Sequence, residues 1–260
     1  MLVDYDGTIA TTDVSDAVMA PFVTPEWDAR AAEYDAGLSG SRRLMLWEVG
    51  VIDDDPDRLR ALAAAQPHDP GFAPFARHAQ QADIPIEVVS DGFGFFIPPA
   101  LAALGVADVP VITAETTFGA DGRASIRFPN GHPECFVCGT CKRNRVLAHQ
   151  AAGRAVVFIG DGESDRYAAG YSDIVFAKRA LAKLCMENRW PFRPWTEFAD
   201  IDAWLASLLE AWRRGAAAIP PPQQKPFFCG PEIWGPGRWD PPTPAGRPEV
   251  TTGSEGVVPG

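Results

Sequence analysis

The sequence lacks any long apolar run, and basic residues are scarce relative to acidic ones. No stretch of eighteen consecutive apolar residues occurs, so no membrane-spanning helix is expected. The 23 Lys and Arg are outnumbered by 34 Asp and Glu, and the formal net charge of −11 argues against sequence-independent nucleic-acid binding. No basic segment followed by an apolar one opens the chain, so no signal peptide is expected and we predict a cytoplasmic protein.

The length and apolar content suffice for a substantial core. At 260 residues, 46% of them hydrophobic, the chain allows one large domain or a core with an inserted segment. Its end differs in character, because eleven of the 25 prolines fall from Pro220 onward. We expect residues 214–260 to form an extended, largely disordered Pro/Gly-rich tail, in which Phe227–Cys229 and Trp234 cover a core surface or recruit a partner.

Two carboxylates flank a single residue at the start of the chain. Asp4 and Asp6 follow the apolar Leu2–Val3 and precede a Gly and a Thr. Residues two apart in a strand share a face, so both carboxylates are predicted at the strand's carboxyl end, where open α/β sheets bind ligands. A calcium loop is excluded, because its twelfth position would be Ser15 rather than Glu. Since three residues precede Asp4, we expect either a short first strand or a start farther upstream.

Three further polar clusters follow in chain order. Ser90 ends the apolar run Ile86–Val89, and its hydroxyl suits a bond to a phosphate oxygen or a helix cap. Lys142 precedes a helical stretch, and its compact ammonium suits a point contact to phosphate. The apolar run Val156–Ile159 leads into Asp161, with a further acid four residues on. Since Mg²⁺ favours a few carboxylates together with waters and substrate phosphate, Asp161 and the first motif predict a magnesium site.

In this order, the four clusters resemble the signature motifs of the haloacid dehalogenase (HAD) superfamily. The long segment between the first two motifs resembles the phosphoserine-phosphatase-like branch. Three segments are most similar to the group that holds the methionine-salvage phosphatase acting on 2-hydroxy-3-keto-5-methylthiopentenyl-1-phosphate, whose relatives include phosphoethanolamine/phosphocholine phosphatases. The segments are Pro25–Trp27, Ser90–Phe96 and the Cys-rich segment before Lys142. The resemblance covers roughly residues 1 to 210. It implies an α/β fold, a Rossmann-like doubly wound parallel sheet with an inserted helical-bundle cap.

The resemblance also implies a phosphoric monoester hydrolase that acts on a small-molecule phosphate ester with Mg²⁺ as cofactor. Asp4 would attack phosphorus to give an aspartyl-phosphate, and Asp6 would protonate the leaving group and then activate water. Asp165 would orient a ligand water or the ammonium of Lys142. The implied residues are phosphate-binding Thr8, Ser90, Asp91, Gly92 and Lys142, and metal-binding Asp4, Asp6, Asp161 and Asp165. Asp91 stands where phosphoserine phosphatases usually carry Gly, so we expect its carboxylate to face away from the phosphate.

Helical periodicity fills the segment after the first motif, with patterned stretches at 14–22, 26–34, 41–49, 58–65 and 72–81. Strand patterns follow at 109–113 and 174–177, with a hairpin over 115–128. We predict a helical cap at 13–82 that covers the site, a catalytic core of 1–12 and 83–213, and the tail from 214. Asp13, Arg43 and Trp47 are candidate substrate residues. A helix cap, a solvated charge and cap core are the alternative interpretations of these three.

Four potential soft-metal ligands lie close together before Lys142, namely His132, Cys135, Cys138 and Cys141. A tetrahedral structural Zn²⁺ is chemically plausible, although the even spacing is cramped for a zinc site. Buried thiols and a redox-sensitive loop are the alternatives, and a stable disulfide is not expected in a reducing cytoplasm. The lysine beside Cys141 favours a lowered thiol pKa.

Two other functions fit the same residues. A phosphotransferase would pass the aspartyl-phosphate to an alcohol instead of water. A non-catalytic metal- or phosphometabolite-binding protein would use the Cys cluster and the aromatic tail, but it predicts loss of Asp4 or Asp6, and both are present. The sequence leaves the ester open among a methylthio-carbohydrate phosphate, an amino-alcohol phosphate and phosphoserine, and it leaves the oligomeric state open.

Overall fold

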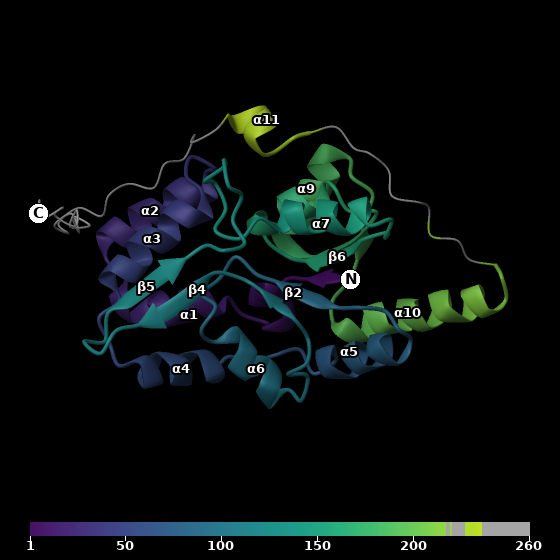
Figure 1. Cartoon of the computed structure of the whole chain (residues 1–260), viewed down its shortest axis with the longest axis horizontal. Helices are drawn as coiled ribbons and strands as arrows, with labels where there is room; N and C mark the ends of the chain where they lie inside the picture. The colour runs from purple at the N-terminus through teal and green to yellow at the C-terminus, as the bar shows by residue number, and fades with distance from the viewer. Residues whose placement is uncertain (217–218, 220–226, 236–260) are drawn as a thin grey trace, which may run out of the picture.

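The computed structural model describes residues 1–216, 219 and 227–235, and its central element is a parallel sheet (Figure 1). The sheet has six strands in the order β3-β2-β1-β6-β7-β8, and all neighbouring pairs are parallel. The strands are β1 (Leu2–Val3), β2 (Glu87–Val89), β3 (Val111–Ile112), β6 (Val157–Gly160), β7 (Ile174–Ala177) and β8 (Arg193–Pro194). The predicted α/β, doubly wound fold is therefore confirmed, and the first strand is short.

Side chains alternate between the two faces of the sheet, so each central strand contributes to two apolar layers. Leu2 and Phe158 pack on one face, whereas their neighbours Val3 and Ile159 pack on the other. The first face is covered by α7 (Lys142–Ala151), α8 (Arg166–Ala169) and α9 (Arg179–Asn188). The second face is covered by α5 (Phe72–Gln81), α6 (Ile97–Ala103) and α10 (Phe198–Arg213). These side chains are buried on both faces, which accounts for the unbroken apolar runs in the sequence.

The order of the strands positions the site. The chain starts in the middle of the sheet at β1, builds β2 and β3 on one side, and later crosses to β6, β7 and β8 on the other. The strand order thus reverses between β1 and β6, the place where doubly wound sheets bind ligands beyond the carboxyl ends of their strands. The backbone N–H of Asp4 donates to the carbonyl of Ile159 over 2.9 Å, so the ends of these two strands are fixed side by side.

Four helices lie over this edge of the sheet. Asp13, Thr24 and Asp55 each accept a hydrogen bond from a backbone N–H in the first turn of the helix that follows. Pro25 and Pro56 occupy first-turn positions, where the missing N–H costs no helical hydrogen bond. The helices are α1 (Val14–Met19), α2 (Pro25–Asp35), α3 (Ser41–Val51) and α4 (Pro56–Ala64). They lie where the periodicity of the sequence predicts them.

A hairpin from the second half of the chain joins these helices. β4 (Glu115–Phe118) and β5 (Ala124–Arg127) pair antiparallel, as the alternation around their turn predicts. The hairpin lies beside α3 in Figure 1, and a backbone bridge joins Asp53 to Arg123. The layer over the site therefore combines two segments that are distant in sequence.

The last helix of the segment predicted as the cap packs elsewhere. The rings of Phe72 and Phe75 in α5 lie 5.0 and 5.4 Å from the ring of Phe198 in α10. This contact places α5 in the layer beneath the sheet, together with the core helices. The cap boundary at residue 82 and the other domain limits remain predictions.

Residues 227–235 return to the core, where α11 (Pro231–Trp234) lies near α9 and α7 in Figure 1. The ring of Phe228 stacks on Tyr171 with 4.6 Å between centroids, and its backbone N–H donates to the Tyr171 hydroxyl over 2.8 Å. This docking agrees with what the aromatics of the tail predict. The disorder expected of the tail is therefore wrong for residues 227–235. Residues 217–218, 220–226 and 236–260 lie outside the described residues.

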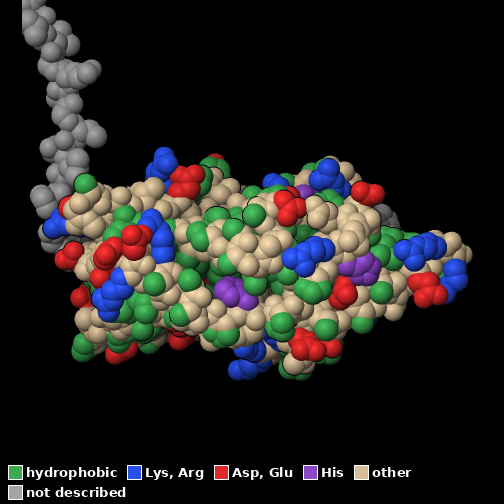
Figure 2. Space-filling model, turned by 90° about the horizontal axis from the view of Figure 1, so that it is seen from below, with side chains coloured by type: hydrophobic (Ala, Val, Ile, Leu, Met, Phe, Trp, Pro, Cys, Tyr) green, Lys and Arg blue, Asp and Glu red, His purple; other side chains and the backbone are tan. Residues whose placement is uncertain are grey.

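Charges of both signs mix on the face drawn in Figure 2, where blue Lys and Arg side chains lie interspersed with red Asp and Glu. The end of α10 projects at the right of this view and carries both colours. Across the described part of the chain, no helix is both long and apolar enough to span a bilayer.

Replacing Phe198 by alanine should destabilise the protein, because this ring joins α10 to α5 in the fully buried layer beneath the sheet. We expect Phe198→Ala to lower the free energy of unfolding by about 3–5 kcal/mol in urea denaturation. Met186→Ala serves as the control, since Met186 is 63% exposed and its truncation should change stability by less than about 0.5 kcal/mol. Equal stabilities of the two variants would contradict the packing described.

Candidate active site

The candidate catalytic residues gather where β1 and β6 end. Asp4 directly follows β1, and Asp161 directly follows β6. After Asp4 the chain turns tightly through the irregular element η1 (Tyr5–Ile9), in which Gly7 has a φ of +69°. A Cβ at position 7 would lie 2.2 Å from a carboxylate oxygen of Asp161. Glycine therefore permits both the left-handed turn and the close approach of the first loop to that carboxylate.

A buried ammonium joins three segments of the chain at this point. The Nζ of Lys142, the first residue of α7, lies 2.6 Å from Oδ1 of Asp4 and 2.7 Å from Oδ1 of Asp165. It also lies 3.2 Å from the hydroxyl of Ser164, and its side chain is 2% exposed. Burial alone would lower the pKa of Lys142, but the charges of Asp165 and Asp4 raise it above its usual value. The lysine is therefore a permanent cation in contact with Asp4.

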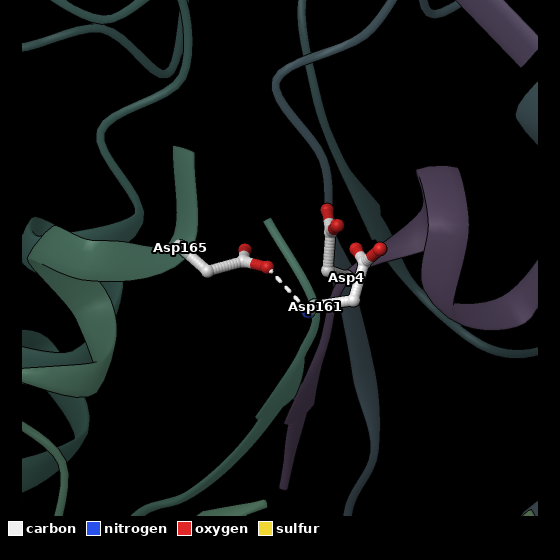
Figure 3. Close-up of side chains that lie close together, drawn as sticks. All are labelled: Asp4, Asp161 and Asp165. Atoms are coloured by element: carbon white, nitrogen blue, oxygen red, sulfur yellow. Dashed lines mark hydrogen bonds between the residues drawn. The ribbon is translucent and has the colours of Figure 1, made fainter. Parts of the chain in front are cut away.

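Asp165 organises the loop that follows β6. Its Oδ2 accepts hydrogen bonds from the backbone N–H groups of Asp161 (2.9 Å) and Gly162 (3.1 Å), while Oδ1 binds Lys142. Figure 3 shows the carboxylates of Asp4 and Asp161 side by side, with Asp165 reaching from the adjacent element toward the backbone of Asp161. Both oxygens of Asp165 are thus engaged, which agrees with the predicted role of orienting Lys142.

The three aspartates fit a magnesium ion. One carboxylate oxygen from each of Asp4, Asp161 and Asp165 lies within 4.8 Å of the other two, and all three residues are buried. Burial and the charge of Asp165 raise the pKa of Asp4 and of Asp161, so the crowded negative charge favours a bound cation. A carboxylate has about four lone-pair sites. Asp165 uses three of them, so Asp4 and Asp161 have more capacity left for a hard cation.

Two neighbours fix the orientation of Asp161. The hydroxyl of Thr8 donates to its Oδ1 over 3.3 Å, and Arg179 at the start of α9 donates to its Oδ2 over 3.1 Å. Thr8 is fully buried and directed at this carboxylate, although the motif predicts a phosphate contact for it. Sequence reasoning missed Arg179, whose signal was the basic pair Lys178–Arg179 directly after the strand pattern at 174–177.

Asp6 has the surroundings of a proton donor. Its oxygens accept a hydrogen bond from the backbone N–H of Val14 (2.9 Å) and one from the hydroxyl of Ser15 (3.3 Å). Burial and the nearby charge of Asp13 raise the pKa of Asp6 well above its usual value. A raised pKa favours the protonated form of a carboxyl group, which is the form that can protonate a leaving oxygen.

The second motif approaches Asp6 closely. A Cβ at Gly92 would lie 2.5 Å from Oδ2 of Asp6, and the Gly92 backbone N–H donates to the Ser90 hydroxyl over 3.0 Å. The carboxylate of Asp91 accepts hydrogen bonds from the hydroxyl of Ser41 at the start of α3 and from the backbone N–H of Thr140 (2.7 Å). Asp91 therefore links the second motif to the start of α3, and it also lines the cavity that contains Asp4. The expectation that it faces away from the phosphate stays a prediction.

A cavity of about 450 Å³ extends from Asp4 and Asp161 toward helices α1, α2 and α3. Of the candidate substrate residues, Asp13 lines this cavity and also caps α1 by accepting from the N–H of Asp16. Arg43 and Trp47 do not line it. The cavity wall instead includes the side chains of Trp27, Tyr34 and Glu48, which sequence reasoning missed. The sequence offers one indication that Glu48 faces the cavity. It follows Ser41, which also lines the cavity, by seven residues, so both lie on one face of α3.

The Cys-rich segment does not form a metal site in the described part of the chain, where the three aspartates are the one group with three ligand atoms within 4.8 Å. The Nδ1 of His132 accepts from the backbone N–H groups of Glu134 and Cys135. The zinc hypothesis for His132, Cys135, Cys138 and Cys141 therefore gains no support. The expected lowered pKa of the Cys141 thiol is wrong, because burial raises it to about 11.

Comparisons with protein families and with curated proteins support the family resemblance of the four motifs. The model of the haloacid dehalogenase-like hydrolase family matches residues 1–170. A protein of Brevibacillus brevis named 2-hydroxy-3-keto-5-methylthiopentenyl-1-phosphate phosphatase is 27% identical over 212 residues, covering 76% of this chain and 90% of its own. A protein of the same name from Geobacillus thermodenitrificans is 29% identical over 205 residues, covering 76% of this chain and 91% of its own. The family resemblance carried by the four motifs is confirmed.

Solved structures show the same fold. A phosphoserine phosphatase with an analogue of the phospho-aspartyl intermediate gives a TM-score of 0.58 at 14% identity, covering 80% of this chain and 96% of the other. A phosphoserine phosphohydrolase-like protein from Francisella tularensis gives a TM-score of 0.59 at 18% identity, covering 80% of this chain and 98% of the other.

Replacing Lys142 by methionine should destabilise the protein, because it leaves Asp4 and Asp165 buried beside each other without their cation. We expect Lys142→Met to lower the free energy of unfolding by about 3–5 kcal/mol in urea denaturation at pH 7 in the presence of a chelator. Lys183→Met, which removes an exposed lysine from α9, should change it by less than about 0.5 kcal/mol. A stable Lys142→Met protein would contradict the electrostatic role of this residue.

Proposed function

Because the chain belongs to the haloacid dehalogenase-like hydrolase family and is a phosphoric monoester hydrolase, we propose that it hydrolyses a small-molecule phosphate ester through a phosphorylated Asp4, with Mg²⁺ as cofactor. One observation carries this proposal. Asp4, with Lys142 at 2.6 Å and Asp161 beside it, stands at the floor of a cavity large enough for a small ester. The proposed nucleophile thus has one buried ammonium beside it and lies in a cluster of carboxylates that suits a cation.

The chemical demand explains why such a site is needed. Phosphate monoesters hydrolyse so slowly that an enzyme must lower the barrier by roughly 20 kcal/mol or more. Attack by a carboxylate oxygen of Asp4 forms an oxygen–phosphorus bond while the bond to the leaving alcohol breaks, which divides the reaction into two easier steps. The ammonium of Lys142 and the hydroxyl of Ser90 would stabilise the charge on the transferring oxygens.

Asp6 would manage the protons of both steps. In the first step it gives its proton to the alcohol oxygen as that oxygen leaves. In the second step it takes a proton from the water that attacks the phosphorylated Asp4, and it returns to its original state. The raised pKa of Asp6 and the orientation that Val14 and Ser15 impose support this role.

The carboxylates of Asp4 and Asp161, with the backbone carbonyl of Asp6 as a further ligand, would hold Mg²⁺. When bound, the ion supplies positive charge to the phosphate and offsets the repulsion among the carboxylates. Asp165, Thr8 and Arg179 would position these ligands without binding the phosphate. Phosphate contacts are proposed for Ser90, Gly92 and Lys142.

The residues that line the cavity from α1, α2 and α3 would determine which leaving group the protein accepts. The names of the curated relatives favour 2-hydroxy-3-keto-5-methylthiopentenyl-1-phosphate, and the structural neighbours favour phosphoserine or a similar amino-alcohol phosphate. Transfer of the phosphoryl group to an alcohol uses the same residues and differs in the final acceptor.

The aspartyl mechanism predicts that Asp4→Asn abolishes phosphate release, because a carboxamide is not a nucleophile toward phosphorus. We expect the wild type to release phosphate from at least one ester of a panel containing the methylthiopentenyl enol phosphate, phosphoserine, phosphoethanolamine and phosphocholine. That release should disappear with a chelator and return with added Mg²⁺. Phosphate is measured colorimetrically, and product analysis with an added alcohol detects transfer.

An exposed aspartate of α2 provides the matched control for this experiment. Asp28→Asn should retain wild-type rates, because Asp28 lies outside the cavity wall. A folded, magnesium-loaded wild type that turns over none of the esters, or an Asp4→Asn variant that keeps its rate, would contradict the proposed function.

The role of Asp6 predicts a dependence on the leaving group. We expect Asp6→Asn to lower kcat by roughly 10²–10⁴ with an alkyl phosphate, whose alkoxide must be protonated. With 4-nitrophenyl phosphate, which needs no proton on departure, the first step should be largely restored and phosphorylated Asp4 should accumulate. Acid quenching followed by intact-mass measurement detects the phosphorylated protein. Equal losses with both esters and no phosphoprotein would argue against this assignment.

A further inference from the structure

The cavity has two chemically different ends. Its inner end holds Asp4, Asp161 and Ser90, where the proposed function places the phosphate. Its outer end is lined from the cap by Asp13, Asp16, Glu48 and two aromatic residues. A phosphate ester bound at the inner end must direct its leaving group into this outer end, so the outer residues select the substrate.

Glu48 is an acid buried without a counter-charge. It is 6% exposed and lines the cavity, and among the described residues no Lys, Arg or His forms an ion pair with it. Its Oε1 accepts a hydrogen bond from the indole N–H of Trp27 over 3.2 Å. Burial raises the pKa of Glu48 to about 7. A buried carboxylate that lacks a cation is costly, and a cation supplied by a ligand would remove that cost.

Aromatic side chains surround the same space. Trp27 in α2 presents its N–H edge to Glu48, and Tyr34, seven residues on in the same helix, also lines the cavity. Carboxylates together with indole and phenol rings form the recognition surface that proteins use for ammonium and quaternary ammonium groups.

Basic side chains are directed away from this end. Arg179 is the one basic residue among the described cavity-lining residues, and it is bonded to Asp161 on the core side. On the cap helices, Arg30 bonds to Glu26, and Arg42 lies over the ring of Phe136. The charged residues that line the cavity from the cap side are therefore all acidic, namely Asp13, Asp16, Asp35 and Glu48.

We infer that the protein selects phosphate esters whose leaving alcohol carries an ammonium or quaternary ammonium group, which Glu48 and the rings of Trp27 and Tyr34 bind. This inference rests on the proposed phosphatase function. It separates this protein from its curated relatives, because the enol phosphate in their names carries no cation. Asp13 and Asp16 contribute longer-range attraction from the mouth of the cavity.

Pairs of esters with the same shape and different charge test the inference. Phosphocholine is matched by 3,3-dimethylbutyl phosphate, and phosphoethanolamine by n-propyl phosphate. In the wild type, kcat/KM for a cationic ester should exceed that of its neutral match by at least about tenfold. Glu48→Gln keeps the size and the acceptor for Trp27, and it should reduce this ratio by a similar factor. The pair with the larger ratio distinguishes a primary from a quaternary amine.

Two controls separate charge recognition from a change in fold. Glu33→Gln removes an exposed acid from α2 outside the cavity and should leave the ratio unchanged. Choline and tetramethylammonium should inhibit the wild type competitively, whereas the neutral alcohol 3,3-dimethylbutanol should not, and this measurement needs no variant.

The outcomes distinguish the two proposals. If the wild type hydrolyses neutral esters or the methylthiopentenyl enol phosphate as well as cationic ones, and Asp4→Asn abolishes this activity, the inference is overturned while the proposed function stands. If no ester is hydrolysed at all, the proposed function is overturned and this inference with it.

Discussion

The ammonium of Lys142 is the interaction on which the rest of the site depends. It contacts Asp4 at the end of β1 and Asp165 beyond β6, and it is itself the first residue of α7. Two carboxylates packed this closely in a buried environment would repel each other strongly without a cation between them. The lysine therefore allows the first, third and fourth motifs to meet, and the same contact places a fixed positive charge beside Asp4, the proposed nucleophile. The stability of the buried carboxylates and the reactivity proposed for Asp4 would thus both depend on the contact with Lys142.

Much of this arrangement could be predicted from the sequence, because the motifs directly follow strands. A strand fixes the direction of the residues at its end, so Asp4 and Asp161 had to lie at one edge once their strands paired. The predicted core strands pair in parallel, and the helices after the first motif lie close to the predicted positions. The sequence pattern therefore predicted correctly those strands and helices that a single continuous segment determines.

The residues that escaped prediction depend on contacts between distant segments. Glu48 reads in the sequence as an acid on a helix, and only the packing of α2 beside α3 brings Trp27 to it. The hairpin β4–β5 was predicted, but its position beside α3 was not. Likewise, the thiol pKa of Cys141 depends on burial, which outweighs its charged neighbour and is not visible in a sequence.

Asp91 connects the inner and outer ends of the cavity through its hydrogen bonds. Its carboxylate binds Ser41 at the start of α3 and the N–H of Thr140, which lies two residues before Lys142. Ser41 and Glu48 lie on the same face of one helix, about two turns apart. Because a helix is rigid over this length, the bond from Asp91 fixes the distance between the phosphate end of the cavity and the buried acid. A glycine at position 91 would lack this bond. The carboxylate that departs from the phosphoserine-phosphatase pattern would therefore connect the proposed phosphate site to the proposed recognition of the leaving group.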